Sequence, residues 1–324
     1  RVNSNGLIEP VGTLGADVVL NGDFEETGAD QVLNGDFAQE GSEEITNGDF
    51  ATDSNWTKGT GWTISGGTAN CDGTQTSSTA MVQETVTNSN ANVKVSFTIS
   101  GYVSGLIKVR NSGGFSGTYV SGNGTYVFYV NTGVATNIVL DADASFVGSV
   151  DNVSVVEVGQ DWSLGDKWSI IDNAARLVSA DSAASTLSQD NVFTVGKNYK
   201  ITLDAVVVSG IAKISGLGGT FIESIDETKT YSIYWVADTT TLTFNRQSTI
   251  SDITITNITV EEVGQEWELT DGCSITAQGA RITSDGTNQY IQQVGALVIG
   301  DTYEMEYEIT ESVSGTIGFS TNFD

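Results

Sequence analysis

The sequence predicts an all-β protein made of tandem antiparallel β-sandwich (jelly-roll) domains of about 105 residues, stacked without linkers. The first observation is an internal repeat, because the string at residues 155–162 (VVEVGQDW) returns at 260–267 (VEEVGQEW). The second is alternation of apolar and polar residues along 93–99, which recurs along 199–205 and 303–309. A period of two over such lengths is typical of half-buried antiparallel strands.

The repeat divides the chain into domains. It predicts a first sandwich over residues 45–158, a second over 159–263 and a third over 264–324. The third copy lacks the last strands of the other two, and a sandwich without its closing strands leaves a bare edge. We therefore expect the chain to be a piece of a longer protein, or its last domain to be completed by a partner. Residues 1–44 form a separate N-terminal assembly segment.

The junctions between the repeats contain no flexible linker. Each closing strand runs directly into the next domain through Val-Gly-Gln-Asp/Glu-Trp, at Gly159-Gln160 and again at Gly264-Gln265. Domains joined so tightly are expected to stack as a stiff rod.

The closing strands of the two full repeats share an irregularity. Their alternation slips by one residue at the same place, across Asp151-Asn152 in the first repeat and Thr256-Asn257 in the second. A one-residue slip is typical of a β-bulge, so we expect a bulge at both positions.

Three copies of Asn-Gly-Asp-Phe stand 13 residues apart, at 21–24, 34–37 and 47–50. Only the third copy is followed directly by a domain, so the first two resemble first strands without sandwiches of their own. We expect them to pair with each other, to cap the first domain or to be donated to neighbouring subunits. Unpaired strand edges favour pairing with another chain, so the segment 18–37 predicts an oligomer.

Charge and composition exclude several kinds of protein. The formal net charge is −28 and there is no histidine. Such a surface is repelled by phosphate backbones, which argues against nucleic-acid binding, and no apolar run is long enough for insertion into a membrane. Without histidine, neither a Ser/His/Asp relay nor a histidine metal site can form from these residues. We therefore expect the chain not to be an enzyme.

Three short motifs carry a resemblance to a family. They are the opening Asn47-Gly48-Asp49-Phe50, the strand Gly61-Trp62-Thr63-Ile64 and the closing segment 149–155 (SVDNVSV). Together they resemble jelly-roll carbohydrate-binding modules of the fourth and ninth families and related galactose-binding-like folds. Such modules occur in secreted bacterial polysaccharide enzymes and, in tandem, in virion structural proteins of bacteriophages. The resemblance is best over 47–158.

This resemblance implies a structural calcium ion near the first strand. The matching carboxylates are Asp49 of the opening and Asp151 of the closing segment, and Asp53 is a further candidate ligand. Calcium takes six to eight oxygen ligands, so backbone carbonyls would have to complete the site. The alternative is that Asp49 only caps a turn after Asn47-Gly48.

Sugar binding requires exposed aromatic rings flanked by polar groups. The candidates that we single out are Trp56, Tyr102 and Tyr119; Trp56 stands first because its surroundings at 54–58 have no counterpart in the other repeats. Other aromatic residues return at equivalent positions of the repeats and are expected in the core, namely Trp62, Trp162, Trp168, Trp267, Tyr126 and Tyr231.

These observations favour a non-catalytic structural or adhesive protein of an extracellular appendage, and the leading hypothesis is a bacteriophage head or tail fibre. The alternatives are a secreted bacterial adhesin or matrix filament, and the accessory binding region of a polysaccharide-degrading enzyme. The expected partners are other copies of the chain or other virion proteins, together with cell-surface polysaccharide. The expected location is extracellular, on the virion surface.

Overall fold

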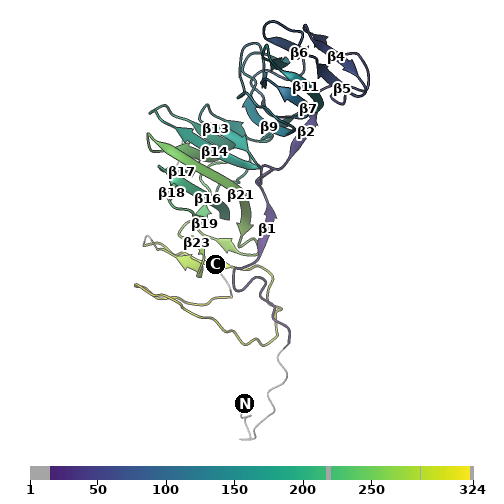
Figure 1. Ribbon diagram of the computed structural model, residues 1–324. Helices are drawn as coiled ribbons and strands as arrows, with labels where there is room; N and C mark the ends of the chain where they lie inside the picture. The colour runs from purple at the N-terminus through teal and green to yellow at the C-terminus, as the bar shows by residue number, and fades with distance from the viewer. Residues whose placement is uncertain (1–14, 217–219, 285, 322–324) are drawn as a thin grey trace, which may run out of the picture.

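The computed structural model describes residues 15–216, 220–284 and 286–321. Within these residues every regular element is a β-strand, and no helix is long and apolar enough to cross a membrane. Figure 1 shows two sandwiches and a smaller third module following one another, with the purple N-terminal segment alongside them. The predicted all-β fold of antiparallel sandwiches is confirmed.

The first sandwich has two antiparallel sheets around one apolar core. One sheet has the order β4-β5-β11-β7-β9, with β2 also paired to β11, and the other has the order β3-β6-β10-β8. The strands are β2 (Glu40–Glu43), β3 (Thr57–Lys58), β4 (Trp62–Ser65), β5 (Thr68–Cys71), β6 (Thr79–Gln83), β7 (Asn92–Ser104), β8 (Ile107–Arg110), β9 (Gly124–Asn131), β10 (Ile138–Ala142) and β11 (Val147–Val158). The side chains of Phe97, Leu140 and Phe146 are fully buried between the sheets.

The second sandwich repeats this plan. Its sheets have the orders β13-β14-β21-β16-β19, with β1 paired to β21, and β12-β15-β20-β17-β18. The strands are β1 (Thr27–Asp30), β12 (Ser163–Leu164), β13 (Trp168–Ile171), β14 (Ala174–Ser179), β15 (Thr186–Gln189), β16 (Asn198–Ser209), β17 (Ala212–Gly216), β18 (Phe221–Ile225), β19 (Lys229–Val236), β20 (Leu242–Arg246) and β21 (Ser251–Val263). The alternation predicted along 93–99 and 199–205 lies in β7 and β16, and the apolar side chains of these two stretches are buried.

The predicted bulges are present in both closing strands. The register of β11 against β7 shifts between Asp151 and Ser154, and β21 shifts against β16 between Thr256 and Thr259. Asn152 and Asn257 take left-handed backbone angles there, with φ of 51° and 53°, a conformation that asparagine tolerates better than most residues. The bulge marks where β11 and β21 lose one neighbouring strand and gain another.

That new neighbour is the N-terminal segment, residues 15–50, which we call the strap. Its strand β2 pairs with β11 of the first sandwich, with Glu43 opposite Val156 and Glu40 opposite Val158. Its strand β1 pairs with β21 of the second sandwich in the same way. Strand β1, within the segment 18–37, is thus paired with the second sandwich of its own chain rather than with the other motif copies, and pairing of this segment with another copy of the chain stays a prediction.

The third module contains four short strands in the described residues. They form two pairs, β22 (Glu268–Leu269) with β25 (Ile291–Gln292) and β23 (Cys273–Thr276) with β24 (Gly279–Ile282). The strand predicted along 303–309 does not form, and Met305 and Tyr307 are exposed. In the second sandwich the equivalent strand β16 lies between β19 and β21. No strand of the described residues takes those places in the third module, so its backbone has no ladder partner.

Candidate functional site

The aromatic residues predicted to bind sugar do not form a common platform. Trp56 is buried, with 7% of its surface exposed, and its ring packs 5.4 Å from that of Phe50. Tyr102 is half-buried against Phe146, and its hydroxyl donates to the carbonyl of Gly105 at 3.0 Å. Tyr119 alone is exposed, at 44%, with the Lys108 ammonium 4.6 Å from its ring centroid.

Trp56 was interpreted wrongly as unique to the first repeat. Its indole Nε1 donates to the backbone carbonyl of Asn47 at 3.1 Å, and Trp162 and Trp267 make the same bond to the other two Asn-Gly-Asp-Phe copies. Trp56 is thus the third member of a repeated set of tryptophans that bind the motifs, of which Trp56 and Trp162 are buried and Trp267, which the sequence placed in the core, is half-buried. Residues 51–55, which separate Trp56 from its motif, hide this equivalence in the sequence.

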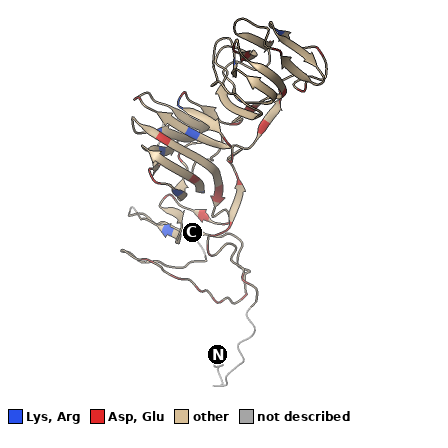
Figure 2. Ribbon diagram, viewed as in Figure 1, with Lys and Arg blue, Asp and Glu red and all other residues tan. Residues whose placement is uncertain are grey.

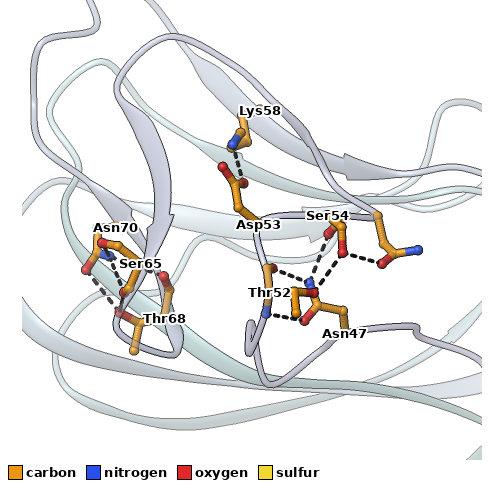
Figure 3. A network of polar contacts seen from close by, with 9 residues as sticks. Asn47, Thr52, Asp53, Ser54, Lys58, Ser65, Thr68 and Asn70 are labelled. Atoms are coloured by element: carbon orange, nitrogen blue, oxygen red, sulfur yellow. Dashed lines mark hydrogen bonds and ion pairs between the residues drawn. The ribbon is translucent and has the colours of Figure 1, made fainter.

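The three candidate calcium ligands have other partners, and Figure 3 shows Asp53 with its partner Lys58. Asp53 forms an ion pair with Lys58, Asp49 accepts the Ala51 N–H at 3.3 Å, and Asp151 accepts the N–H of its neighbour Asn152 at 2.6 Å. Among the described residues there is no group of three or more His, Cys, Asp or Glu side chains that could hold a metal ion. A calcium site takes six to eight oxygens, so these carboxylates would have to be joined by further ligands such as backbone carbonyls.

The Asp49 bond belongs to a turn that all three motifs share. Asp23 and Asp36 accept backbone N–H groups two residues onward in the same way, at 3.2 and 3.1 Å. The alternative interpretation of Asp49 as a turn residue thus agrees with the geometry. Figure 3 shows the neighbouring side chain of Asn47, which bonds the backbone of Thr52 and Ser54 and holds the following loop.

The Asn-Gly-Asp-Phe copies dock onto the three modules in reverse order. The copy at 47–50 binds the first sandwich, the copy at 34–37 binds the second, and the copy at 21–24 binds the third module. In each copy the phenylalanine N–H donates to the asparagine carbonyl, at 3.1 to 3.3 Å, which closes a tight turn. The phenylalanine ring then packs against the module's tryptophan in a tilted arrangement, with centroids 5.2 to 5.4 Å apart.

A glutamine of each module holds the residue before the motif. Gln189 accepts the Leu33 N–H and donates to the Leu33 carbonyl, both at 2.8 Å. Gln83 makes the same two bonds to Thr46, at 2.9 and 2.8 Å, and Gln293 makes them to Leu20, both at 2.9 Å. A side-chain amide that pairs with both backbone groups of one residue replaces a step of a β-ladder. Sequence reasoning missed these glutamines.

The glycine of the motif lies against the bulged strand. The Gly35 carbonyl accepts the Ile258 N–H at 3.0 Å, and the Gly48 carbonyl accepts the Val153 N–H at 2.9 Å. A Cβ on Gly35 or Gly48 would lie 2.0 Å from the Ile258 or Val153 carbonyl oxygen. Glycine is therefore required at this position of the second and third copies.

An ionic contact joins the strap to the first sandwich, and an aromatic side chain packs across the first junction. Lys94 of β7 donates to Glu40 of β2 at 2.6 Å, and this bond raises the pKa of Lys94. Tyr129 of β9 packs against the core of the second sandwich, and burial raises its pKa. Figure 2 shows acidic residues on the strap and on both sandwiches.

A polar cavity of about 700 Å³ lies at the same junction. Amide and carboxylate side chains line it, and its lining contains no lysine or arginine. Asn131 donates to the Asn90 carbonyl at 3.1 Å and to the Asn92 side chain at 3.2 Å. The lining residues are Asn90–Asn92, Asn131, Glu157–Trp162, Leu164–Asp166 and Trp168. The cavity suits a neutral or cationic polar ligand better than an anion.

Comparison with known proteins identifies no family. No protein-family model matches the chain, and no curated protein matches it. Among solved structures, the N-terminal CBM22 tandem domain of Xyn10C from Paenibacillus barcinonensis aligns with 11% identity and a TM-score of 0.28, over 69% of this chain and 99% of that one. Allantoicase from Saccharomyces cerevisiae aligns with 9% identity and a TM-score of 0.25, over 57% and 77% of the two chains.

A putative beta-galactosidase from Bacteroides fragilis aligns with 12% identity and a TM-score of 0.19, over 67% of this chain and 32% of that one. Likenesses this slight decide nothing about the ligand of the present chain.

Proposed function

We propose that this protein is a non-catalytic structural component of an extracellular appendage, and that the appendage is a bacteriophage head or tail fibre. The observation that carries the proposal is the strap, which binds all three modules through an equivalent tryptophan and an equivalent glutamine. Neighbouring modules are thus connected twice, once through the linker-free junction and once through the strap. Two connections resist bending where a single linker would allow it.

The second junction supports the same role. The buried side chain of Asn198, in β16 of the second sandwich, accepts the Ile275 N–H of the third module at 3.1 Å. A hydrogen bond buried between modules fixes their relative orientation, because breaking it would leave two polar groups without water. A fixed orientation between modules suits a structural component that must keep an extended shape.

Immunogold electron microscopy would test the fibre proposal. Antibodies against the purified chain should label a head or tail appendage of phage particles from the producing culture. Label confined to the bacterial surface would instead indicate the adhesin or matrix filament. Label in neither place, with the chain free in the medium, would contradict an appendage role altogether.

A second candidate function is binding of a neutral polysaccharide, and the polar cavity at the first junction favours it. Asn131 and Asp161 offer hydrogen-bonding groups there, and no fixed positive charge competes for them. Affinity electrophoresis through gels containing neutral polysaccharides should show retardation that Asn131→Ala and Asp161→Ala reduce. Ser77→Ala, at an exposed position of the first sandwich, is the matched control. Equal mobility of all four proteins would exclude this cavity as the binding site.

A further inference from the structure

The strap contains three units in succession, at 18–30, 31–43 and 44–50, each with one Asn-Gly-Asp-Phe motif, and the motifs are 13 residues apart. Only the last unit is continuous with the module that it binds. The second unit reaches a tryptophan 128 positions away, and the first reaches one 246 positions away. The contacts of a unit therefore do not depend on chain continuity with its module.

All three modules offer the strap the same groups. Each presents an indole N–H to the asparagine carbonyl and a glutamine amide to the residue before it. The two sandwiches add the N–H of the bulged strand, from Val153 or Ile258. The residue two positions before the asparagine is apolar in every unit, and Val32 and Ile45 are buried there.

Each requirement restricts the sequence of the bound peptide. Only glycine fits against the bulged strand. The glutamine amide hydrogen-bonds both the N–H and the carbonyl of the residue before the asparagine, so that residue needs an extended backbone. The phenylalanine fills a space in the core, where Phe37 and Phe50 are each 1% exposed. The groups on the modules thus select one short sequence, Val/Ile-x-Asn-Gly-Asp-Phe.

We propose that each sandwich carries a peptide-binding site specific for Val/Ile-x-Asn-Gly-Asp-Phe, and that a unit from a second copy of this chain can occupy it. Exchange of identical segments between copies preserves every contact, so it needs no new complementary surface. The tethered unit acts at an effective concentration in the millimolar range, so the closed form prevails in dilute solution. Where copies are crowded together, exchanged units would link one chain to the next. This inference goes beyond the fibre proposal and can fail independently of it.

The test uses the full chain, folded first and then cut. A recognition sequence for a specific protease is inserted between Ala38 and Gln39, both exposed, and cleavage leaves residues 1–38 as a separate strap fragment. Cut chains carrying a fluorescent label on this fragment are mixed with unlabelled cut chains. We expect labelled strap fragments to exchange onto cut chains that had no labelled fragment. Energy transfer to an acceptor dye on the second sandwich of those chains measures this exchange.

Synthetic peptides then test specificity by fluorescence anisotropy on the cut chain. A labelled peptide of residues 28–41 should bind, and the peptide of residues 15–28 should compete with it, since the sites are shared. Peptides carrying Phe37→Ala or Gly35→Val should bind more than about a hundredfold more weakly, as expected for loss of a buried ring or a steric clash. A peptide carrying Leu33→Ala is the control and should bind like the native one, because that side chain is exposed.

Two results would overturn the proposal. One is equal binding of the native and Gly35→Val peptides, which would show that the site does not read the motif. The other is a labelled fragment that does not exchange between copies and is not displaced by the peptide, while circular dichroism shows that the sandwiches are folded. Both results are independent of where the protein is found on a particle.

Discussion

Trp162 donates its indole N–H to the backbone carbonyl of Asn34, at 3.1 Å and across 128 positions of sequence. This bond makes a segment near the N-terminus part of the second sandwich. The same relationship between Trp267 and Asn21 spans 246 positions. The modules are therefore not structurally independent of one another, because two of them take their opening segment from the strap.

Replacing Phe37 by alanine should destabilise the second sandwich selectively. The ring is 1% exposed and packs on Trp162 in that core, so its removal should cost about 3–5 kcal/mol. Differential scanning calorimetry should show one transition moved to lower temperature while that of the first sandwich stays in place. Leu33→Ala, on the same strap but 60% exposed, should change stability by less than about 0.5 kcal/mol. A uniform shift of all transitions by Phe37→Ala would contradict the assignment of this unit to one sandwich.

The pH dependence of the second sandwich's stability should reflect the ionisation of Asp204. Hydrogen bonds from Asn257 at the bulge and then from Thr230 lower the pKa of this carboxyl. A group whose pKa is lowered on folding stabilises the fold above its unfolded pKa, about 4 for aspartate, and loses that contribution as the pH falls through the folded value. In urea unfolding at decreasing pH, the free energy of unfolding of Asp204→Asn should therefore fall less steeply than that of the native protein. Glu84→Gln, at an exposed position of the first sandwich, serves as control, and identical acid profiles for Asp204→Asn and the native protein would refute the role.

Local pattern explains which parts of the fold could be predicted. The alternation along β7 and β16 and the bulges at Asn152 and Asn257 are signals carried by neighbouring residues, and the structure confirms them. Where a strand depends on distant partners, as along 303–309, alternation alone predicted an element that does not form. A strand needs a paired neighbour as well as a pattern.

The role of the strap could not be read from local pattern. The sequence contains three Asn-Gly-Asp-Phe motifs and three modules, and each module has a tryptophan near its start. That agreement in number was the available clue. The motifs run in the opposite order to their modules, however, so no alignment of neighbouring segments brings Asn34 beside Trp162. Trp56 was misread for the same reason, because only its module keeps motif and tryptophan close in sequence.

Chelation should leave the stability of the first sandwich unchanged. Asp53 is engaged with Lys58, and Asp49 accepts a turn N–H, so the carboxylates that the family resemblance pointed to are already used. Thermal unfolding with and without a calcium chelator should give superimposable curves, and Asp49→Asn, which retains a turn-forming side chain, should behave like the native protein. A lower melting temperature with chelator, lost in Asp49→Asn, would instead establish a calcium site, because a bound ion stabilises the native state by mass action.

The array of modules should behave as a stiff rod in solution, and the strap should be part of the reason. The two sandwiches are joined at Gly159-Gln160 without slack, and the strap connects them again, because its strand β2 pairs with the first sandwich and its strand β1 with the second. Small-angle scattering of the native chain should give an extended particle, and single-particle images should show one narrow range of angles between sandwiches.

Cutting the strap between Ala38 and Gln39 should broaden that range, because one of the two connections is then lost. A cut at an inserted site in the exposed segment 182–184 of the second sandwich leaves both connections intact and should not broaden it. A compact particle, or equally wide angles before and after the strap is cut, would show that the strap does not brace the array.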